Sequence, residues 1–272
     1  MRFSLAHLTL LSCTPPELTR MAARLGYDFV SLRTIYMGLP NEPNYDLAAN
    51  RDLLRETKRA LADTGLGLHD IELARICDGT DPRRYLPAFE VAAELGCGQA
   101  IASVWTAERN YALDRFREIC DLARPLGIRV NLEFMAFSEL RTLVEALAFL
   151  RAAGSPNAGL LIDSLHFHCS QGSLAELDDV PRGLLDFVHI CDGPAAVPAT
   201  REGLIHRARY ARQYLGQGGI DVAGLVNRLP ELVYSIELPN PIQVEIHGRE
   251  GHARLCLETA RAYFAAHPRK AG

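Results

Sequence analysis

The strongest constraint on this sequence is its repeated alternation between short apolar runs and longer amphipathic stretches. Near-continuous apolar runs such as AGLLID and DFVHIC are typical of strands that are buried on both faces of a sheet. The predicted strands cover residues 3–9, 29–33, 66–71, 99–104, 129–134, 159–162, 187–191 and 233–238. The predicted helices have apolar residues every three or four positions. They cover residues 16–25, 47–64, 86–95, 113–126, 139–153 and 253–266.

Glycine marks the junctions between these helices and the strands that follow them. The phrases RLGYDFVSL, ELGCGQAIA and PLGIRVNLEF repeat one order of helix end, glycine and strand. Glycine is favoured just past a helix because the chain turns there through a left-handed conformation. The predicted strands begin between residues 3 and 233. Their average spacing is therefore roughly 33 residues, the length of one strand–helix unit.

These units predict an α/β fold, a single (β/α)8 TIM barrel that covers residues 1–272 as one domain. The length of 272 residues suits such a barrel, which uses about 250 residues. No change of composition and no long linker divides the chain. A doubly wound open sheet is the alternative. It is disfavoured because no G-x-G-x-x-G follows the first predicted strand and no phosphate-binding lysine loop occurs.

The charge, hydropathy and cysteine pattern of the chain indicate which partners and which location to expect. The chain has 29 Lys and Arg against 33 Asp and Glu, a net charge of −4, so we expect no nucleic-acid partner. No apolar run reaches the 18 or so residues of a membrane helix, and we read the N-terminus as the first strand rather than a signal peptide. The seven cysteines lack any C-x-x-C pair. This pattern favours a reducing, cytoplasmic location over a disulfide framework.

Acidic and imidazole side chains stand at the ends of four consecutive predicted strands. The runs NLEF, LLID, FVHI and SIEL carry Glu133, Asp163, His189 and Glu237. In a parallel barrel the carboxyl ends of all strands meet at one mouth. Three carboxylates that meet among apolar residues repel one another, and a divalent cation relieves the repulsion. An oxygen-rich set with one imidazole favours Mn²⁺, Mg²⁺ or Co²⁺, with Zn²⁺ as a further option.

Each of these four residues also has an ordinary structural interpretation. A single aspartate after a strand is often the N-cap of a helix, and a single strand histidine is often a hydrogen-bonded core residue. The coincidence of four strand ends favours joint metal binding.

A long segment, residues 194–219, interrupts the strand–helix rhythm. It ends in a glycine cluster and contains Arg201, Arg207, Arg209 and Arg212. An insertion after a barrel strand lies on the carboxyl face, where the active sites of such barrels lie. The alternative is a solvated helix and loop without a functional role.

The ordered motifs L-E-F, L-I-D-x-x-H, V-H-I-x-D and S-I-E resemble those of the xylose-isomerase-like TIM barrels. This family includes sugar (phosphate) isomerases and epimerases, inosose dehydratases and 3-dehydroshikimate dehydratases. The resemblance covers essentially the whole chain. Its motifs are specific for the fold and the metal ligands, but they do not distinguish between the reactions of the family.

The resemblance implies roles for individual residues. The metal ligands would be Glu133, Asp163, His189 and Glu237. His166, three residues after the aspartate, would contact the substrate. The family motif R-x-x-P-G-x-G, whose arginine holds the substrate, matches R-Q-Y-L-G-Q-G and therefore Arg212. Leu215 stands where proline is usual and Gln217 where an acid is common, so the geometry of this loop is an open question.

Other basic residues near strand ends are predicted to face the same mouth. The further substrate-binding candidates are His7, Arg33 and His69, while Trp105 would form an apolar wall. Arg33, Arg75 and Arg212 together favour a carboxylate or phosphate on the substrate. The alternative is that each arginine pairs with a nearby acid such as Glu72.

The resemblance implies a divalent-metal-dependent isomerase or epimerase of a small keto-sugar or related hydroxy-ketone, acting through an enediolate. Glu133 and Glu237 would exchange the proton as catalytic acid and base. The alternative is a metal-dependent dehydratase of a cyclic hydroxy-ketone such as 3-dehydroshikimate or inosose.

Two more distant hypotheses are a metal-dependent endonuclease, which the negative charge disfavours, and an inactive binding barrel, which the intact ligand set disfavours. The expected partner is a small molecule, with neither nucleic acid nor membrane. A homodimer or homotetramer is also expected for barrels of this kind.

Overall fold

A computed structural model of the chain describes residues 1–38 and 42–269. Within these residues, parallel strands close into a barrel in sequence order, from β1 to β8 and back to β1. The strands are β1 Arg2–Leu5, β2 Phe29–Arg33, β3 Gly67–Ile76, β4 Gln99–Val104, β5 Arg129–Glu133, β6 Ala158–Asp163, β7 Phe187–Ile190 and β8 Val233–Ile236. The predicted TIM barrel is therefore confirmed.

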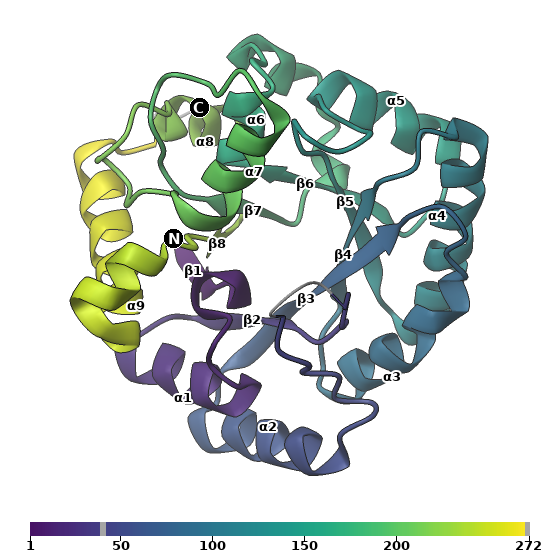
Figure 1. Cartoon of the computed structure of the whole chain (residues 1–272), viewed down its shortest axis with the longest axis horizontal. Helices are drawn as coiled ribbons and strands as arrows, with labels where there is room; N and C mark the ends of the chain where they lie inside the picture. The colour runs from purple at the N-terminus through teal and green to yellow at the C-terminus, as the bar shows by residue number, and fades with distance from the viewer. Residues whose placement is uncertain (39–41, 270–272) are drawn as a thin grey trace.

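The helices form a ring around the strands (Figure 1). They are α1 Pro15–Leu25, α2 Arg51–Thr64, α3 Leu86–Glu94, α4 Arg109–Ala123, α5 Leu143–Ala153, α6 Ser164–Cys169, α7 Arg201–Tyr210, α8 Val222–Arg228 and α9 Pro241–Ala266. The last is interrupted at Gly248, whose backbone is not helical. In Figure 1, α7 lies inside the outer ring, toward the barrel.

The local signals at the helix ends behave as the sequence indicates. Thr14 and Glu17 form a capping box at the start of α1, and each satisfies a backbone N–H of the other residue. Gly26 ends the same helix with a φ of 84°, a conformation that costs glycine little. These caps set where each helix stops, and the following strand can then enter the sheet.

The core lies in two layers, one inside the barrel and one between the strands and the helices. Phe116 of α4 and Phe149 of α5 pack edge to face, with ring centroids 5.5 Å apart, and both are fully buried. Burial of apolar surface of this kind is the main force that holds the helices on the barrel. The rigid barrel in turn fixes the positions of the strand ends.

Two strands differ from the predicted bounds in ways that matter for the site. The first strand ends at Leu5, and His7–Leu10 is a 3-10 helix, because Thr9 Oγ1 donates to the carbonyl of Ile236 and draws the chain across the barrel end. The third strand runs on to Ile76, with an irregular register between Ile71 and Ala74. Its carboxyl end is therefore five residues later than the sequence indicates.

Helices account for the other differences. The segment 194–219 contains α7, and α8 follows it, although neither was predicted. In the part of the chain that the structure covers, no helix is both long enough and apolar enough to cross a membrane.

Candidate metal and substrate site

Four side chains converge at the carboxyl end of the barrel. Glu133 and Asp163 are the last residues of β5 and β6, His189 lies in β7, and Glu237 directly follows β8. One ligand atom from each lies within 4.8 Å of the ligand atoms of the others, and all four residues are buried. Asp163 and His189 are direct partners in the strand register. The barrel therefore brings together all four residues predicted to bind a metal.

The geometry around His189 fits a cation. Its Nδ1 lies 3.6 Å from Glu237 Oε2 and 3.9 Å from oxygens of both Glu133 and Asp163. Neither ring nitrogen has a hydrogen-bond partner among the described residues. A buried polar atom without a partner is destabilising by about 1–3 kcal/mol, and a metal ion bound to Nδ1 would satisfy it.

The electrostatics of the cluster also favour a cation. Burial, together with the charge of Glu237, holds the pKa of Glu133 well above its ordinary value. Burial acts to raise the pKa of Glu237 too, but Arg212 and His189 outweigh it and lower that pKa. Three buried carboxylates thus face one fixed positive charge, that of Arg212. A divalent cation would bring the sum of these charges to zero.

Arg212 is buried and holds two of the candidate ligands in place. Its Nη1 lies 2.6 Å from Asp163 Oδ2, its Nη2 lies 2.7 Å from Glu237 Oε2, and its Nε donates to the carbonyl of Ala208. The side chain reaches the cavity wall. These contacts show that it positions Asp163 and Glu237, whereas its predicted contact with the substrate stays a prediction.

The loop that carries Arg212 is organised by Asp192. Its Oδ1 accepts from the backbone N–H groups of Gly193 and Ile220, and its Oδ2 accepts from those of Gly216 and Gly218, at 2.8–3.0 Å. A Cβ atom at Gly218 would lie 2.3 Å from Asp192 Oδ1, so this position requires glycine. The loop is ordered through Asp192 without the proline that is usual in this motif.

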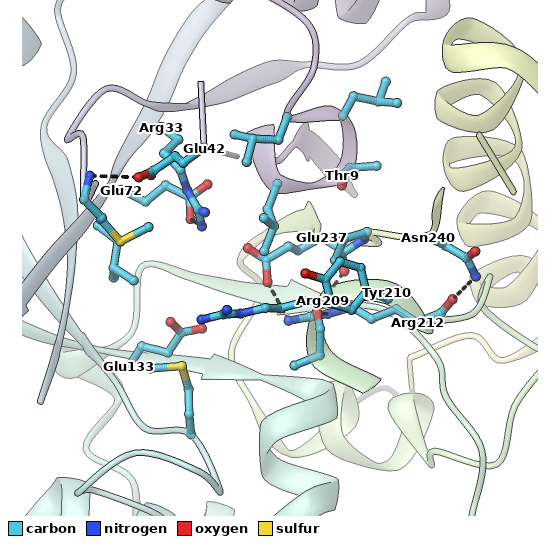
Figure 2. A pocket seen from close by; sticks show the side chains of 18 of the residues that line it. Thr9, Arg33, Glu42, Glu72, Glu133, Arg209, Tyr210, Arg212, Glu237 and Asn240 are labelled. Carbon is cyan, nitrogen blue, oxygen red and sulfur yellow. Dashed lines mark hydrogen bonds and ion pairs between the residues drawn. The ribbon is translucent and has the colours of Figure 1, made fainter. Parts of the chain in front are cut away.

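A cavity of about 670 Å³ lies above the cluster, a size that suits a small-molecule ligand. Glu133 and Glu237 line it, together with five other predicted residues: Arg33, Arg75, Trp105, His166 and Arg212. Figure 2 shows Glu133, Glu237 and the arginines from different elements around one space. The two remaining candidate ligands, Asp163 and His189, are buried and are not part of the cavity wall.

His166 is anchored through the backbone of its helix. Asp163 Oδ1 accepts from the backbone N–H groups of Leu165 and His166, so Asp163 is also the N-cap of α6. Burial lowers the pKa of His166 to about 4, which keeps the imidazole neutral at pH 7. A neutral ring that packs against Phe137 can offer the cavity one donor and one acceptor.

The expectation that His69 lies at this mouth is wrong. Its ring packs against Phe29 and Phe187, the first residues of β2 and β7, and its Nδ1 contacts Asp70 Oδ2 at 3.0 Å. Because β3 begins at Gly67 and continues to Ile76, residue 69 lies near its amino end. His69 therefore lies at the opposite end of the barrel from the cluster.

His7 lies behind the cavity wall rather than in it, which corrects the prediction of a substrate contact. Its Nε2 donates to the carbonyl of Cys13, and its Nδ1 accepts from the backbone N–H of Arg33. Its ring stacks on Tyr45 at 5.2 Å between centroids. With both nitrogens bonded to backbone, His7 positions the end of β2, and burial lowers its pKa to about 4.

The arginines differ in their contacts, and these contacts differ from those that the sequence indicates. Arg33 pairs with Glu72 at 2.9 Å, so the alternative of an acid partner holds for Arg33. Arg75 instead lies over the ring of Trp105, 4.2 Å from the centroid. Arg209 and Tyr210 of α7 also line the cavity, although no sequence motif gives either residue a role there. The signals for this segment were its position after a barrel strand and its arginine-rich composition.

Replacing Asp192 by alanine is expected to lower stability substantially, because it leaves four backbone N–H groups of the loop without their acceptor. Each unsatisfied buried group is destabilising by about 1–3 kcal/mol, although water will reach some of them. Urea denaturation measures the loss. Asp192→Asn is the matched control, because its amide oxygen retains acceptor capacity, and it should lose less. Equal stability of Asp192→Ala and the unaltered protein would contradict this role.

Comparison with known proteins agrees with this fold. The chain is 27% identical over 230 residues to a 3-dehydroshikimate dehydratase of Pseudomonas aeruginosa, covering 79% of this chain but only 34% of that protein. It is 28% identical over 232 residues to an L-ribulose 3-epimerase of Methylomonas sp., covering 78% of this chain and 73% of the other. It is 25% identical over 243 residues to an inosose isomerase of Bacillus velezensis, covering 83% of each.

Solved structures share the fold at lower identity. The IOLI protein, determined with a bound zinc atom, superposes with a TM-score of 0.79 at 19% identity and covers 98% of this chain and 99% of its own. A D-allulose 3-epimerase from Methylomonas sp. in complex with D-allulose gives 0.71 at 19% identity, covering 97% of both chains. The model of the xylose isomerase-like TIM barrels matches residues 19–265. The chain is a member of that family and, like its named relatives, an enzyme.

Proposed function

We propose that this chain is a divalent-metal-dependent isomerase or epimerase of a small keto-sugar or related hydroxy-ketone, acting through an enediolate. The observation that carries the proposal is the buried Glu-Asp-His-Glu cluster beneath a cavity that is lined by two of its own carboxylates. The epimerase and inosose isomerase relatives support the same reaction class, at 25–28% identity.

Glu133, Asp163, His189 and Glu237 would hold the cation. When bound, the cation would withdraw electron density from a ketone oxygen and its neighbouring hydroxyl, and so acidify the adjacent C–H. The donor set favours Mn²⁺, Mg²⁺ or Co²⁺, and the zinc of the IOLI structure keeps Zn²⁺ as an option.

The chain's own residues would carry the proton. Glu133 and Glu237 extend from β5 and from the end of β8, so they approach a ligand in the cavity from different strands. One carboxylate would remove the proton and the other return it. His166, held neutral by burial, would hydrogen-bond a substrate hydroxyl. Trp105, Met135 and Phe137 would exclude water from the reacting carbon.

A dehydratase of a cyclic hydroxy-ketone is the second candidate. It uses the same first step, removal of a proton next to the ketone, but then expels hydroxide from the β-carbon. The observations that favour it are the 3-dehydroshikimate dehydratase relative and the arginines that line the cavity. A homodimer or homotetramer, one domain over residues 1–272 and a cytoplasmic location remain proposals that rest on the sequence.

Adding MnCl₂ to protein treated with EDTA is expected to raise its melting temperature by roughly 5–10 °C, because an ion that binds only the folded state stabilises it by about 2.7 kcal/mol at 100 times its Kd. Calorimetry measures the shift. His189→Gln should abolish it, while His168→Gln, in a histidine outside the cluster, should retain it. An equal shift in His189→Gln and in the unaltered protein would place the metal elsewhere.

The Mn²⁺-loaded protein should exchange the α-hydrogen of a ketose, of inosose or of 3-dehydroshikimate for solvent deuterium, as NMR detects. Glu133→Gln and Glu237→Gln are expected to slow exchange by about 10²-fold or more, as the loss of a general acid or base does. The control is Glu139→Gln, because Glu139 is an exposed glutamate that follows β5, the strand of Glu133. Metal content is measured in each variant.

Two results would correct the proposal. Exchange at the original rate in both glutamine variants would exclude the acid and base roles of Glu133 and Glu237. Loss of water from the substrate, together with the absorbance of a more extensively conjugated product, would assign the dehydratase reaction in place of the isomerase.

A further inference from the structure

Two arginines in the cavity wall have no acidic partner in the part of the chain that the structure describes. Arg33 pairs with Glu72, and Arg212 pairs with Asp163 and Glu237. Arg75 and Arg209 line the same cavity, yet neither makes an ion pair or a hydrogen bond through its guanidinium to any residue in 1–38 or 42–269 that the contacts record. Charged side chains in a partly enclosed cavity are usually paired, so this pair of arginines requires an explanation.

Arg75 stacks on Trp105 through the face of its guanidinium, so the N–H groups at the guanidinium edge remain available. Its guanidinium carbon lies 4.2 Å from the ring centroid of Trp105, and the indole N–H of Trp105 donates to Ser103 Oγ at 2.8 Å, which fixes the ring. The Arg75 Nε is buried and has no hydrogen-bond partner within the described part of the chain. Stacking uses the face of a guanidinium and leaves its N–H groups available in one plane, the arrangement that binds a carboxylate or phosphate through two bonds.

Arg209 lines the same cavity from a different element, α7, whereas Arg75 belongs to β3. Arg209 lies near the end of α7, and Figure 2 shows it extending into the cavity. Burial lowers its pKa, and the nearby charges of Arg75 and Arg33 add to the effect. Arg75 and Arg209 are therefore close enough to repel each other, and an anion between them would relieve that repulsion.

The acidic residues of the cavity wall already have other partners or roles. Glu72 neutralises Arg33, and Glu133 and Glu237 belong to the proposed cation site. The remaining one, Glu42, acts on Arg33 and accepts from the backbone N–H of Met37. With a divalent cation in the cluster, the cavity therefore has more positive than negative charge near Arg75 and Arg209.

We propose that Arg75 and Arg209 form a subsite for an anionic group of the substrate, which is therefore an acidic hydroxy-ketone that bears a carboxylate or a phosphate. The anionic group sits against Arg75 and Arg209, while the ketone end of the molecule reaches the cluster of Glu133 and Glu237. This assignment of the substrate class rests on the proposed function of the cluster.

The test compares matched neutral and anionic probes by isothermal titration calorimetry of the Mn²⁺-supplemented protein. Quinate against myo-inositol tests a carboxylate on a hydroxylated ring, and ribulose 5-phosphate against ribulose tests a phosphate on a ketose. At least one anionic probe should bind 10-fold or more tightly than its neutral partner, and the pair with the larger ratio identifies the anion. Ratios below 3-fold for both pairs would overturn the proposal.

Variants test whether Arg75 and Arg209 cause the preference for an anionic probe. Arg209→Gln and Arg75→Met, which keeps an apolar stem on Trp105, should each weaken the preferred anion about 10- to 100-fold, as loss of a charged hydrogen bond does. Neither should change the affinity for the neutral partner, which also shows that the cavity is intact. Arg209→Lys keeps the charge and should lose less affinity than Arg209→Gln. Arg182→Gln removes an exposed charge outside the cavity wall and should behave as the unaltered protein.

The outcomes separate this inference from the proposed function. Metal-dependent exchange of neutral ketoses without any preference for anions would refute the subsite and leave the proposed function in place. An anion preference that Arg75→Met and Arg209→Gln abolish, in a protein with no exchange activity on any probe, would support the subsite and refute the proposed function. Equal weakening of the anionic and neutral probes in both variants would refute the subsite.

Discussion

The mutual repulsion of three buried carboxylates is the constraint on which the rest of this site depends. Glu133, Asp163 and Glu237 come together because a closed parallel barrel brings its strand ends to one rim. An apolar barrel does not tolerate such a cluster without compensation. Arg212 supplies one positive charge. A divalent cation would satisfy the remaining negative charge and the ring nitrogens of His189, which have no hydrogen-bond partner among the described residues.

The segment after β7 connects that electrostatic requirement to the fold. Asp192 gathers four backbone N–H groups of the loop, and the loop then delivers Arg212 to Asp163 and Glu237. The preceding helix, α7, brings Arg209 into the cavity wall. One insertion therefore both positions two of the candidate ligands and shapes the space above them, so the candidate metal site and the cavity wall are physically coupled.

Much of the candidate site could be predicted from the sequence because the sequence shows where most of the strands end. An acidic residue that directly follows a run of apolar residues, as in AGLLID, has its position fixed by the barrel, so the four candidate ligands were named correctly as a group that converges. The prediction failed where a strand boundary was misplaced. His69 was assigned to the mouth because β3 was cut short at residue 71, whereas the strand continues to Ile76 and places His69 at the opposite end.

The sequence by itself determined the architecture and which four residues form the candidate ligand cluster, because periodicity, glycine stops and strand ends are local signals that repeat. Tertiary structure alone decided which polar groups form hydrogen bonds or ion pairs within the protein. It bonded both nitrogens of His7 to backbone, paired Arg33 with Glu72, and stacked Arg75 on Trp105, with the Nε of Arg75 unpaired among the described residues. Pairing depends on distances between side chains from different strands, and those distances exist only once the barrel has closed.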